Sequence, residues 1–268
     1  MARTPLVLDV LQAVAATLAA DTGRARLEIV DAGGGTGGFA VPLASLGHSV
    51  TVIDTSPDSL AAAQRRAAEQ SVPLRAIQGE AADLATLAGE QSADLVLCHS
   101  VLEYVDSPPA AMAAIAAVLR PGGAVSVLTA SAVAAVIHRA LAGRFDEARR
   151  LLTGIGPGPD GNGNGSAPGR RGPAGTGTAG AGTAPGGRGP ASTGPRRFTL
   201  AGVTGLIERA GLRPGAALGV RVFADLVPRV VADADPGAEH ALQGLELAVS
   251  AHPAFHDFAA QFHVLGYR

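Results

Sequence analysis

The sequence predicts a doubly wound α/β fold, in which a mainly parallel β-sheet carries helices on both faces. Short apolar runs alternate with helical patterns from residue 27 to residue 129, at the spacing of strand–helix–strand units. A glycine-rich turn, 31–38, joins the first apolar run to the helix that follows it. The chain has 268 residues, of which 47% are hydrophobic, so it is long enough to bury a full core in one domain.

The first half of the chain contains five of the expected strands. A helix over 6–18, with apolar residues at helical spacing, is expected to lie against an edge of the sheet. Another helix begins near Phe39, and a third begins at Pro57 after Ser56 as its N-cap. A further helix is expected over 108–119. The strands are expected at 27–32, 49–53, 74–78, 94–98 and 124–129.

Beyond residue 130 the regular alternation stops. Two helices are expected over 132–141 and 145–152, and Thr199 is expected to cap a helix that Gly211 ends. The last elements are expected to be a strand over 217–227, a helix over 238–251 with Leu242, Leu245 and Val249 facing inward, and a strand over 261–267.

One segment has an unusual composition. From residue 154 to residue 195 it consists almost wholly of Gly, Pro, Ser, Thr, Ala and Arg, without apolar periodicity. Such a segment cannot offset the entropy lost on ordering by burying apolar surface. We therefore expect a disordered Gly/Pro-rich insertion at 154–197, within a single domain that spans 1–268.

The composition excludes several kinds of protein. The net charge of -2 produces no global field that would favour nucleic acid. Cys98 is the only cysteine, which excludes a disulfide scaffold and a cysteine-rich metal site. No apolar run reaches the roughly 18 residues of a membrane span, and the N-terminus has no apolar signal core. We expect a cytoplasmic protein with no metal and no membrane partner.

The glycine turn indicates a nucleoside ligand at the end of the first strand. Gly33, Gly35 and Gly38 match the dinucleotide fingerprint, and glycines let a ligand approach the backbone closely. Asp31 lies where a pyrophosphate would bind, and its carboxylate repels phosphate but attracts a cation. This favours S-adenosyl-L-methionine, which carries a sulfonium and an ammonium, over NAD. The alternative is a tight turn that binds no ligand.

Further candidate contacts follow the next three strands. Asp54 lies about twenty residues after the glycines, where a carboxylate can accept both ribose hydroxyls, or else caps a helix. Asp83, in the segment 79–84 (GEAADL), is either an acceptor for the adenine amine or a helix N-cap. His99 follows the fourth strand and either contacts the methionyl end of the donor, contacts the substrate, or is structural.

Four features together resemble the class I S-adenosylmethionine-dependent methyltransferases. They are DAGGGTG at 31–37, Asp54, GEAADL at 79–84 and LRPGG at 119–123. The resemblance implies a seven-stranded Rossmann-like sheet whose last strand inserts antiparallel, with S-adenosyl-L-methionine as the methyl donor. It implies donor contacts at Gly33, Gly34, Asp54, Ala81, Ala82 and His99, beside the candidates Asp31, Gly35 and Asp83 named from the residues themselves.

A narrower likeness is to the bacterial tRNA 5-carboxymethoxyuridine methyltransferases. It rests on HSVLEYV at 99–105, His138 with AGRFD at 142–146, and GVRVFAD at 219–225. That family esterifies a carboxylate on a modified wobble uridine, so tRNA is the implied partner. A carboxylate is ionised at neutral pH and needs no general base, and no catalytic residue is assigned here.

Two arginines are candidates for binding an acidic acceptor. Arg221 is expected in the middle of a strand, where a charge is costly unless paired, and its planar guanidinium suits a carboxylate. The alternative is a structural ion pair with Asp225 or Glu246. Arg144 is the second candidate.

Three functions are compatible with the sequence. The first is methylation of the modified wobble uridine in tRNA, and the second is methylation of a small metabolite such as a quinone or a secondary metabolite. The third is a non-catalytic module that binds an adenosyl nucleoside. Ordered basic residues above the glycine turn would favour tRNA methylation. A closed apolar pocket there would favour methylation of a small metabolite, and donor binding without turnover would favour the non-catalytic module.

Overall fold

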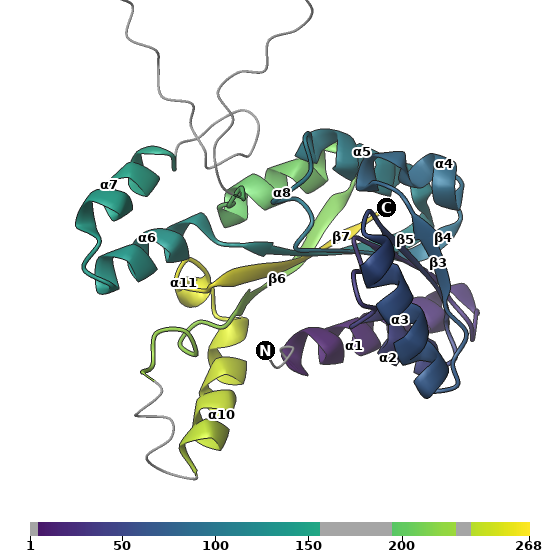
Figure 1. Cartoon of the computed structure of the whole chain (residues 1–268), viewed down its shortest axis with the longest axis horizontal. Helices are drawn as coiled ribbons and strands as arrows, with labels where there is room; N and C mark the ends of the chain where they lie inside the picture. Colours follow the sequence, from purple (N-terminus) through teal and green to yellow (C-terminus); the bar gives the residue numbers. More distant parts are fainter. Residues whose placement is uncertain (1–4, 156–194, 229–236) are drawn as a thin grey trace, which may run out of the picture.

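The computed structural model describes residues 5–155, 195–228 and 237–268. Its centre is a seven-stranded sheet with the strand order β3-β2-β1-β4-β5-β7-β6 (Figure 1). Strand β7 runs antiparallel to both of its neighbours, β5 and β6, whereas β1 to β5 pair in parallel. The strands are β1 (Glu28–Ala32), β2 (Ser49–Asp54), β3 (Arg75–Gln78), β4 (Ala93–His99), β5 (Leu119–Ala130), β6 (Arg213–Val220) and β7 (Gln261–Tyr267). The predicted doubly wound sheet with an antiparallel last strand is confirmed.

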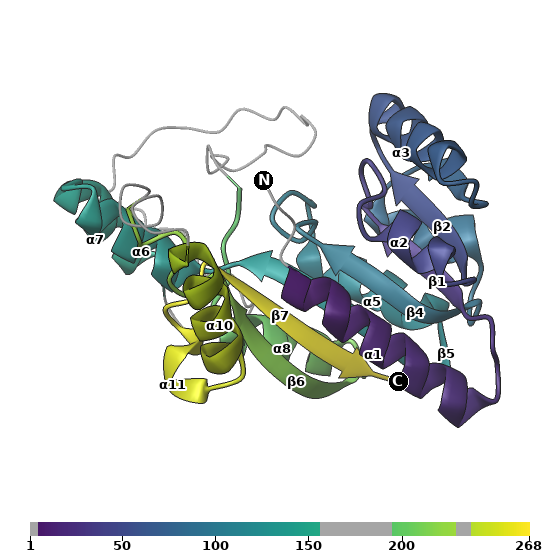
Figure 2. The same ribbon diagram turned by 90° about the horizontal axis from the view of Figure 1, so that it is seen from below.

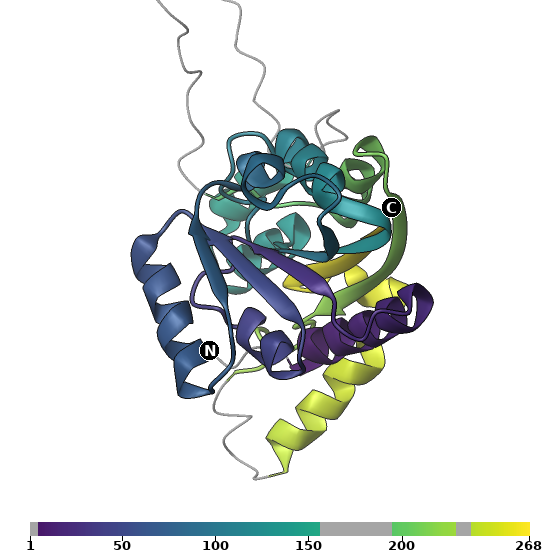
Figure 3. The ribbon, with the colours of Figure 1, turned by 90° about the vertical axis from the view of Figure 1, so that its right-hand side faces the viewer.

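Helices cover both faces of this sheet, as Figure 3 shows. One face carries α1 (Pro5–Thr22), α2 (Ala40–Ser45) and α3 (Pro57–Glu69), and the other carries α4 (Leu84–Ala88), α5 (Pro108–Val118) and α8 (Leu200–Arg209). The predicted N-caps Ser56 and Thr199 accept hydrogen bonds from the first turns of α3 and α8. The remaining helices are α6 (Ala132–Leu141), α7 (Phe145–Thr153), α10 (Ala238–Ser250) and α11 (Pro253–His256).

Helix α1 does not lie at an edge of the sheet, which corrects the prediction. Its buried residues Val7 and Leu11 share a core with Ile29, Leu97 and Ala124, which come from three central strands. Figure 2 shows α1 running across this face of the sheet. The apolar stripe of α1 therefore closes the middle of one core layer.

The strand predicted over 217–227 is shifted. Strand β6 begins at Arg213 and ends at Val220, and residues 221–227 form turns. Arg221 has φ 59°, a left-handed conformation that a strand does not contain. The Glu246 carboxylate accepts hydrogen bonds from three successive backbone N–H groups, those of Val222, Phe223 and Ala224, at 2.8, 2.7 and 2.6 Å. These contacts stabilise the turn that ends the strand.

The C-terminal helix also differs from its expected packing. Val249 is buried, but Leu245, which was expected to face inward, is 47% exposed. The prediction for Leu245 is wrong because only the last turns of α10 pack into the small cluster around Val222 and Ala259.

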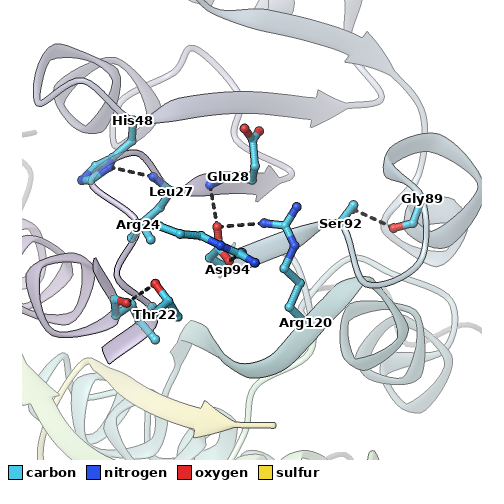
Figure 4. Close-up of polar contacts among 10 residues, drawn as sticks. Thr22, Arg24, Leu27, Glu28, His48, Gly89, Ser92, Asp94 and Arg120 are labelled. Atoms are coloured by element: carbon cyan, nitrogen blue, oxygen red, sulfur yellow. Dashed lines mark hydrogen bonds and ion pairs between the residues drawn. The ribbon is translucent and has the colours of Figure 1, made fainter. Parts of the chain in front are cut away.

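The amino ends of three strands are joined by one buried carboxylate (Figure 4). Asp94, at the start of β4, is 2% exposed. It accepts hydrogen bonds from Arg24 Nη1 at 2.5 Å, from Arg120 Nη1 at 2.9 Å and from the Glu28 N–H at 2.9 Å. Asp94 therefore ties the starts of β1, β4 and β5 together at the end of the sheet opposite to the glycine turn.

Most of the predicted insertion at 154–197 lies outside the described residues, since 156–194 are not among them. The described chain on both sides belongs to one sheet, because β6 and β7 pair beside β5. In the described parts of the chain, no helix combines the length and the apolar character needed to cross a lipid bilayer.

Candidate donor-binding site

A cavity of about 370 Å³ opens at the carboxyl ends of β1, β2 and β4. This volume falls within the range of small-molecule sites, which is roughly 300–1,000 Å³. We call it the larger cavity. Its lining comes from the glycine turn, the ends of β2 and β3, and the loop after β4: Gly33, Asp54, Thr55, Gly79, Glu80, Ala81, Ser100, Val101, Tyr104, Val105 and Asp106.

The glycine turn has no room for a side chain at its first two glycines. Gly33 has φ +67°, and a Cβ built there would lie 2.3 Å from the Val101 Cγ2 atom. A Cβ on Gly34 would lie 2.5 Å from the Asp31 carboxylate. Gly35 also has a left-handed backbone, with φ +53°. In this turn, which we call the glycine cradle, the side chains of Val101 and Asp31 pack directly against backbone that only glycine leaves uncovered.

Asp54 ends β2 inside the larger cavity. Its Oδ2 atom accepts a hydrogen bond from the Gly35 N–H at 2.9 Å, and its Oδ1 atom accepts one from the Ser56 N–H at 2.9 Å. A carboxylate has about four acceptor positions, so two more donors can bind it. The two backbone contacts fix the carboxylate beside the turn, where it can accept the hydroxyls of a ribose.

The segment after β3 supplies part of the lining. Gly79, Glu80 and Ala81 line the larger cavity, whereas Ala82 and Asp83 are exposed and are not among its lining residues. Asp83 precedes α4 without capping it through its side chain. The acid that reaches the cavity is thus Glu80, which sequence reasoning missed although it lies in the same GEAADL segment.

A smaller cavity of about 150 Å³ adjoins the larger one and shares Gly33 and Ser100 with it. Asp31, Phe39 and His99 are among its lining residues. The His99 ring packs edge-on against Phe39, with centroids 4.7 Å apart, and its Nε2 atom lies 2.8 Å from the Ser126 Oγ atom. Burial, reinforced by the neighbouring His263, lowers the pKa of His99 well below its usual value. The imidazole is therefore neutral at pH 7.

Arg196, near the C-terminal end of the predicted insertion, fixes the loop after β4. The Arg196 guanidinium donates to the carbonyl oxygens of Val105 and Asp106, and the Arg196 N–H donates to the Glu103 carbonyl at 3.0 Å. Glu103 itself is buried, and burial raises the pKa of its carboxyl group. Tyr104, on the same loop, lines the larger cavity and is 72% exposed. Sequence reasoning missed Arg196 because its partners lie about ninety residues away.

The two arginines proposed for an acidic acceptor lie elsewhere. Arg221 pairs with Asp225, which is the structural alternative named for it. Arg144 precedes α7 and lies 3.8 Å from the Glu147 carboxylate. Neither arginine lines the larger or the smaller cavity. No group of three His, Cys, Asp or Glu side chains that could hold a metal ion occurs among the described residues.

Comparison with known proteins agrees with this geometry. Residues 30–127 match a family model described as a methyltransferase domain. The tRNA 5-carboxymethoxyuridine methyltransferase of Escherichia coli K12 is 36% identical over 129 residues, which cover 47% of this chain and 49% of the relative. A ubiquinone biosynthesis O-methyltransferase of Methylobacterium nodulans is 38% identical over 97 residues, covering 36% of this chain and 38% of the relative. The chain thus matches about half the length or less of these curated relatives.

Solved structures share the fold over more of the chain. The magnesium protoporphyrin IX methyltransferase of Synechocystis PCC 6803, solved with bound SAH, has a TM-score of 0.54 at 15% identity, covering 97% of this chain and 83% of that one. A methyltransferase structure from Methanosarcina mazei has a TM-score of 0.53 at 14% identity, covering 91% and 93%. The seven-stranded sheet, the glycine turn and the match of residues 30–127 to a methyltransferase domain support the resemblance to the class I S-adenosylmethionine-dependent methyltransferases, and they support S-adenosyl-L-methionine as the cofactor.

Proposed function

We propose that this chain methylates a carboxylate on a modified wobble uridine of tRNA, with S-adenosyl-L-methionine as the methyl donor. The observation that carries the proposal is the pair of adjoining cavities, one with Asp54 at its ribose position and one lined by Asp31 and His99. Within them, Asp54 would hold the ribose, Glu80 and Ala81 the adenine, and Asp31 and His99 the methionyl end. When bound, the donor supplies a methyl group that its sulfonium already activates.

The chain's own residues then have to position an acceptor and exclude water. Positioning of this kind contributes roughly 7–11 kcal/mol to a barrier reduction. The lowered pKa of His99 makes its imidazole a weak base, which favours an acceptor that arrives already ionised. A carboxylate with a pKa of about 4 meets that requirement at neutral pH.

Two features at the cavity mouth favour a nucleic-acid acceptor. Tyr104 exposes its ring beside the larger cavity, and aromatic rings of this kind stack on unpaired RNA bases. Arg196 and Arg197, the last two residues of the predicted insertion, lie next to the same loop, where their charge can attract phosphate.

The second candidate is O-methylation of a small metabolite such as a quinone precursor. It is favoured by the 38% identity to the ubiquinone biosynthesis relative and by the modest volume of the smaller cavity. A phenolic hydroxyl has to lose a proton during such a reaction, and Asp31 is the carboxylate available in that cavity.

The test is mass spectrometry of tRNA nucleosides after the purified chain is incubated with S-adenosyl-L-methionine and tRNA from a strain lacking the methyl ester. We expect conversion of the free carboxylate to its methyl ester. A parallel incubation with a catechol-type quinone precursor covers the second candidate. Methylation of that precursor without tRNA conversion would contradict the tRNA proposal, and donor binding without turnover of either would support a non-catalytic nucleoside-binding module.

We also propose that residues 1–268 fold as a single domain. The support is that the elements before and after the predicted insertion contribute to one sheet and share its core, as Phe198 and Leu206 do with Val96 and Val127. A single cooperative unfolding transition, monitored by both circular dichroism and tyrosine fluorescence, is the expected result. Two separate transitions would contradict the proposal.

A further inference from the structure

The loop between β4 and α5 forms one wall of the larger cavity. It supplies five of the eleven lining residues: Ser100, Val101, Tyr104, Val105 and Asp106. The loop consists of turns and bends, without the repeating backbone hydrogen bonds of a helix or a strand. The position of this wall therefore depends on the groups that hold the loop from outside.

The first half of the loop is joined to the end of β5. The Ser100 N–H donates to the Leu128 carbonyl at 2.7 Å. The buried Glu103 carboxylate accepts hydrogen bonds from the Thr129 hydroxyl at 3.0 Å and from the Ala130 N–H at 2.7 Å. These contacts fix residues 100–103 on the sheet.

The second half of the loop is held by Arg196. Its backbone N–H donates to the Glu103 carbonyl at 3.0 Å, and its guanidinium donates to the Val105 carbonyl and, at 3.0 Å, to the Asp106 carbonyl. A guanidinium presents its N–H donors in a planar fork, so it can bind two neighbouring acceptors at once. One arginine thus binds three carbonyl groups within four successive residues of the loop.

Arg196 is itself fixed to the sheet by the residues that follow it. Phe198 is fully buried, its N–H donates to the Ala130 carbonyl at 2.9 Å, and its carbonyl accepts from the Ala132 N–H at 2.8 Å. These anchors do not involve the Arg196 side chain. Truncation of that side chain should therefore release the second half of the loop and leave both the segment 196–198 and the first half of the loop in place.

We propose that Arg196 is a positioning residue for the methyl donor, which holds the second half of the loop where it completes the wall of the larger cavity. The proposal rests on the donor site proposed above. Arg196 is not among the lining residues, so it acts through Tyr104, Val105 and Asp106. If the wall is in place only about one-tenth of the time, the observed affinity for the donor falls about tenfold.

Hydrogen exchange of the ligand-free protein gives the first readout. The N–H groups of Tyr104 and Val105 donate to the Val101 carbonyl at 2.9 and 3.3 Å, so their exchange rates report the order of the loop. In Arg196→Ala we expect faster exchange at these two amides than in the wild type, with no change in the amides of β1. Unchanged exchange at Tyr104 and Val105 would overturn the proposal.

Calorimetry with S-adenosylhomocysteine gives the second readout, and we expect about tenfold weaker binding by Arg196→Ala. Arg196→Lys keeps the charge but places all its donors on one nitrogen, so it should recover only part of the affinity. Faster exchange with unchanged affinity in Arg196→Ala would overturn the positioning role. Full affinity in Arg196→Lys would overturn the role of the guanidinium fork.

The matched control is Arg268→Ala. The Arg268 guanidinium also donates to backbone carbonyls, those of Ala116 at 2.8 Å and of Leu119, but at the opposite end of the sheet. This variant should bind S-adenosylhomocysteine as the wild type does. An equal loss of affinity in Arg268→Ala would show a general effect of losing such contacts and would overturn the proposal.

The two readouts are independent of the acceptor, because neither uses tRNA. A failure of tRNA methylation would therefore leave them intact. The variant Asp54→Ala separates the donor site from the role of Arg196. If Asp54→Ala loses affinity and Arg196→Ala does not, the donor site stands and only the positioning role is wrong.

Discussion

Replacement of Asp94 by alanine removes the carboxylate that joins the starts of three strands. The loss can be worked from its three contacts. The Glu28 N–H donates to a buried charged acceptor, which contributes about 1.5–3 kcal/mol. Arg120 is 27% exposed and Arg24 is 48% exposed, so each ion pair adds only about 0.2–1 kcal/mol after solvent screening.

The expected loss for Asp94→Ala is therefore about 2–5 kcal/mol in the free energy of unfolding. Urea denaturation measures it, and Arg24→Ala is the matched control, with an expected loss below about 1 kcal/mol. Because Asp94 lies at the opposite end of the sheet, the affinity of the folded variant for S-adenosylhomocysteine should not change. A loss below about 1 kcal/mol for Asp94→Ala would refute the reasoning that this carboxylate joins the strands.

Three further predictions follow from the site and its surroundings. Gly33→Ala should abolish measurable donor binding in calorimetry while the protein stays folded, because the new Cβ would meet Val101; unchanged affinity would contradict the cradle. Between pH 6.5 and about 4, the unfolded chain takes up a proton that buried His263 does not, so stability should fall by up to about 3 kcal/mol as the pH falls through this window. A comparison of urea titrations of the wild type and His263→Gln isolates this contribution, and parallel pH profiles would contradict it. Arg221→Lys should leave methyl transfer unchanged, because Arg221 pairs with Asp225 outside both cavities; loss of transfer with normal folding would restore its acceptor role.

Much of the fold could be predicted because its signals are local. Most of the first five strands are apolar runs, and the N-caps Ser56 and Thr199 act on helix turns within three residues of themselves. Strand β7 coincides with the predicted residues 261–267. The errors arise where distant contacts decide. The turn after β6 depends on Glu246, more than twenty residues away, and no local pattern around Arg221 indicates it.

The site residues that lie at the ends of strands could be predicted from the sequence. Those whose position depends on side-chain contacts between distant strands could not. Gly33, Asp54 and His99 line the cavities because each lies at or directly after the carboxyl end of a parallel strand, and these ends meet at one edge of the sheet. Their roles in donor binding stay predictions. Ser126 and His263 are 137 residues apart in the sequence, and Ser126 lies 27 residues from His99. Only the register of β5 against β7 brings them together.

The central claim is that the larger cavity binds the adenosyl group through Asp54, and calorimetry of Asp54→Ala with S-adenosyl-L-methionine tests it most directly. Charged hydrogen bonds contribute about 1.5–3 kcal/mol, so we expect the affinity to fall by roughly 2 kcal/mol or more. Asp58→Ala, at an exposed acid in the first turn of α3, is the matched control and should bind the donor normally. Unchanged affinity in Asp54→Ala, or preferred binding of NAD by the wild type, would contradict the claim.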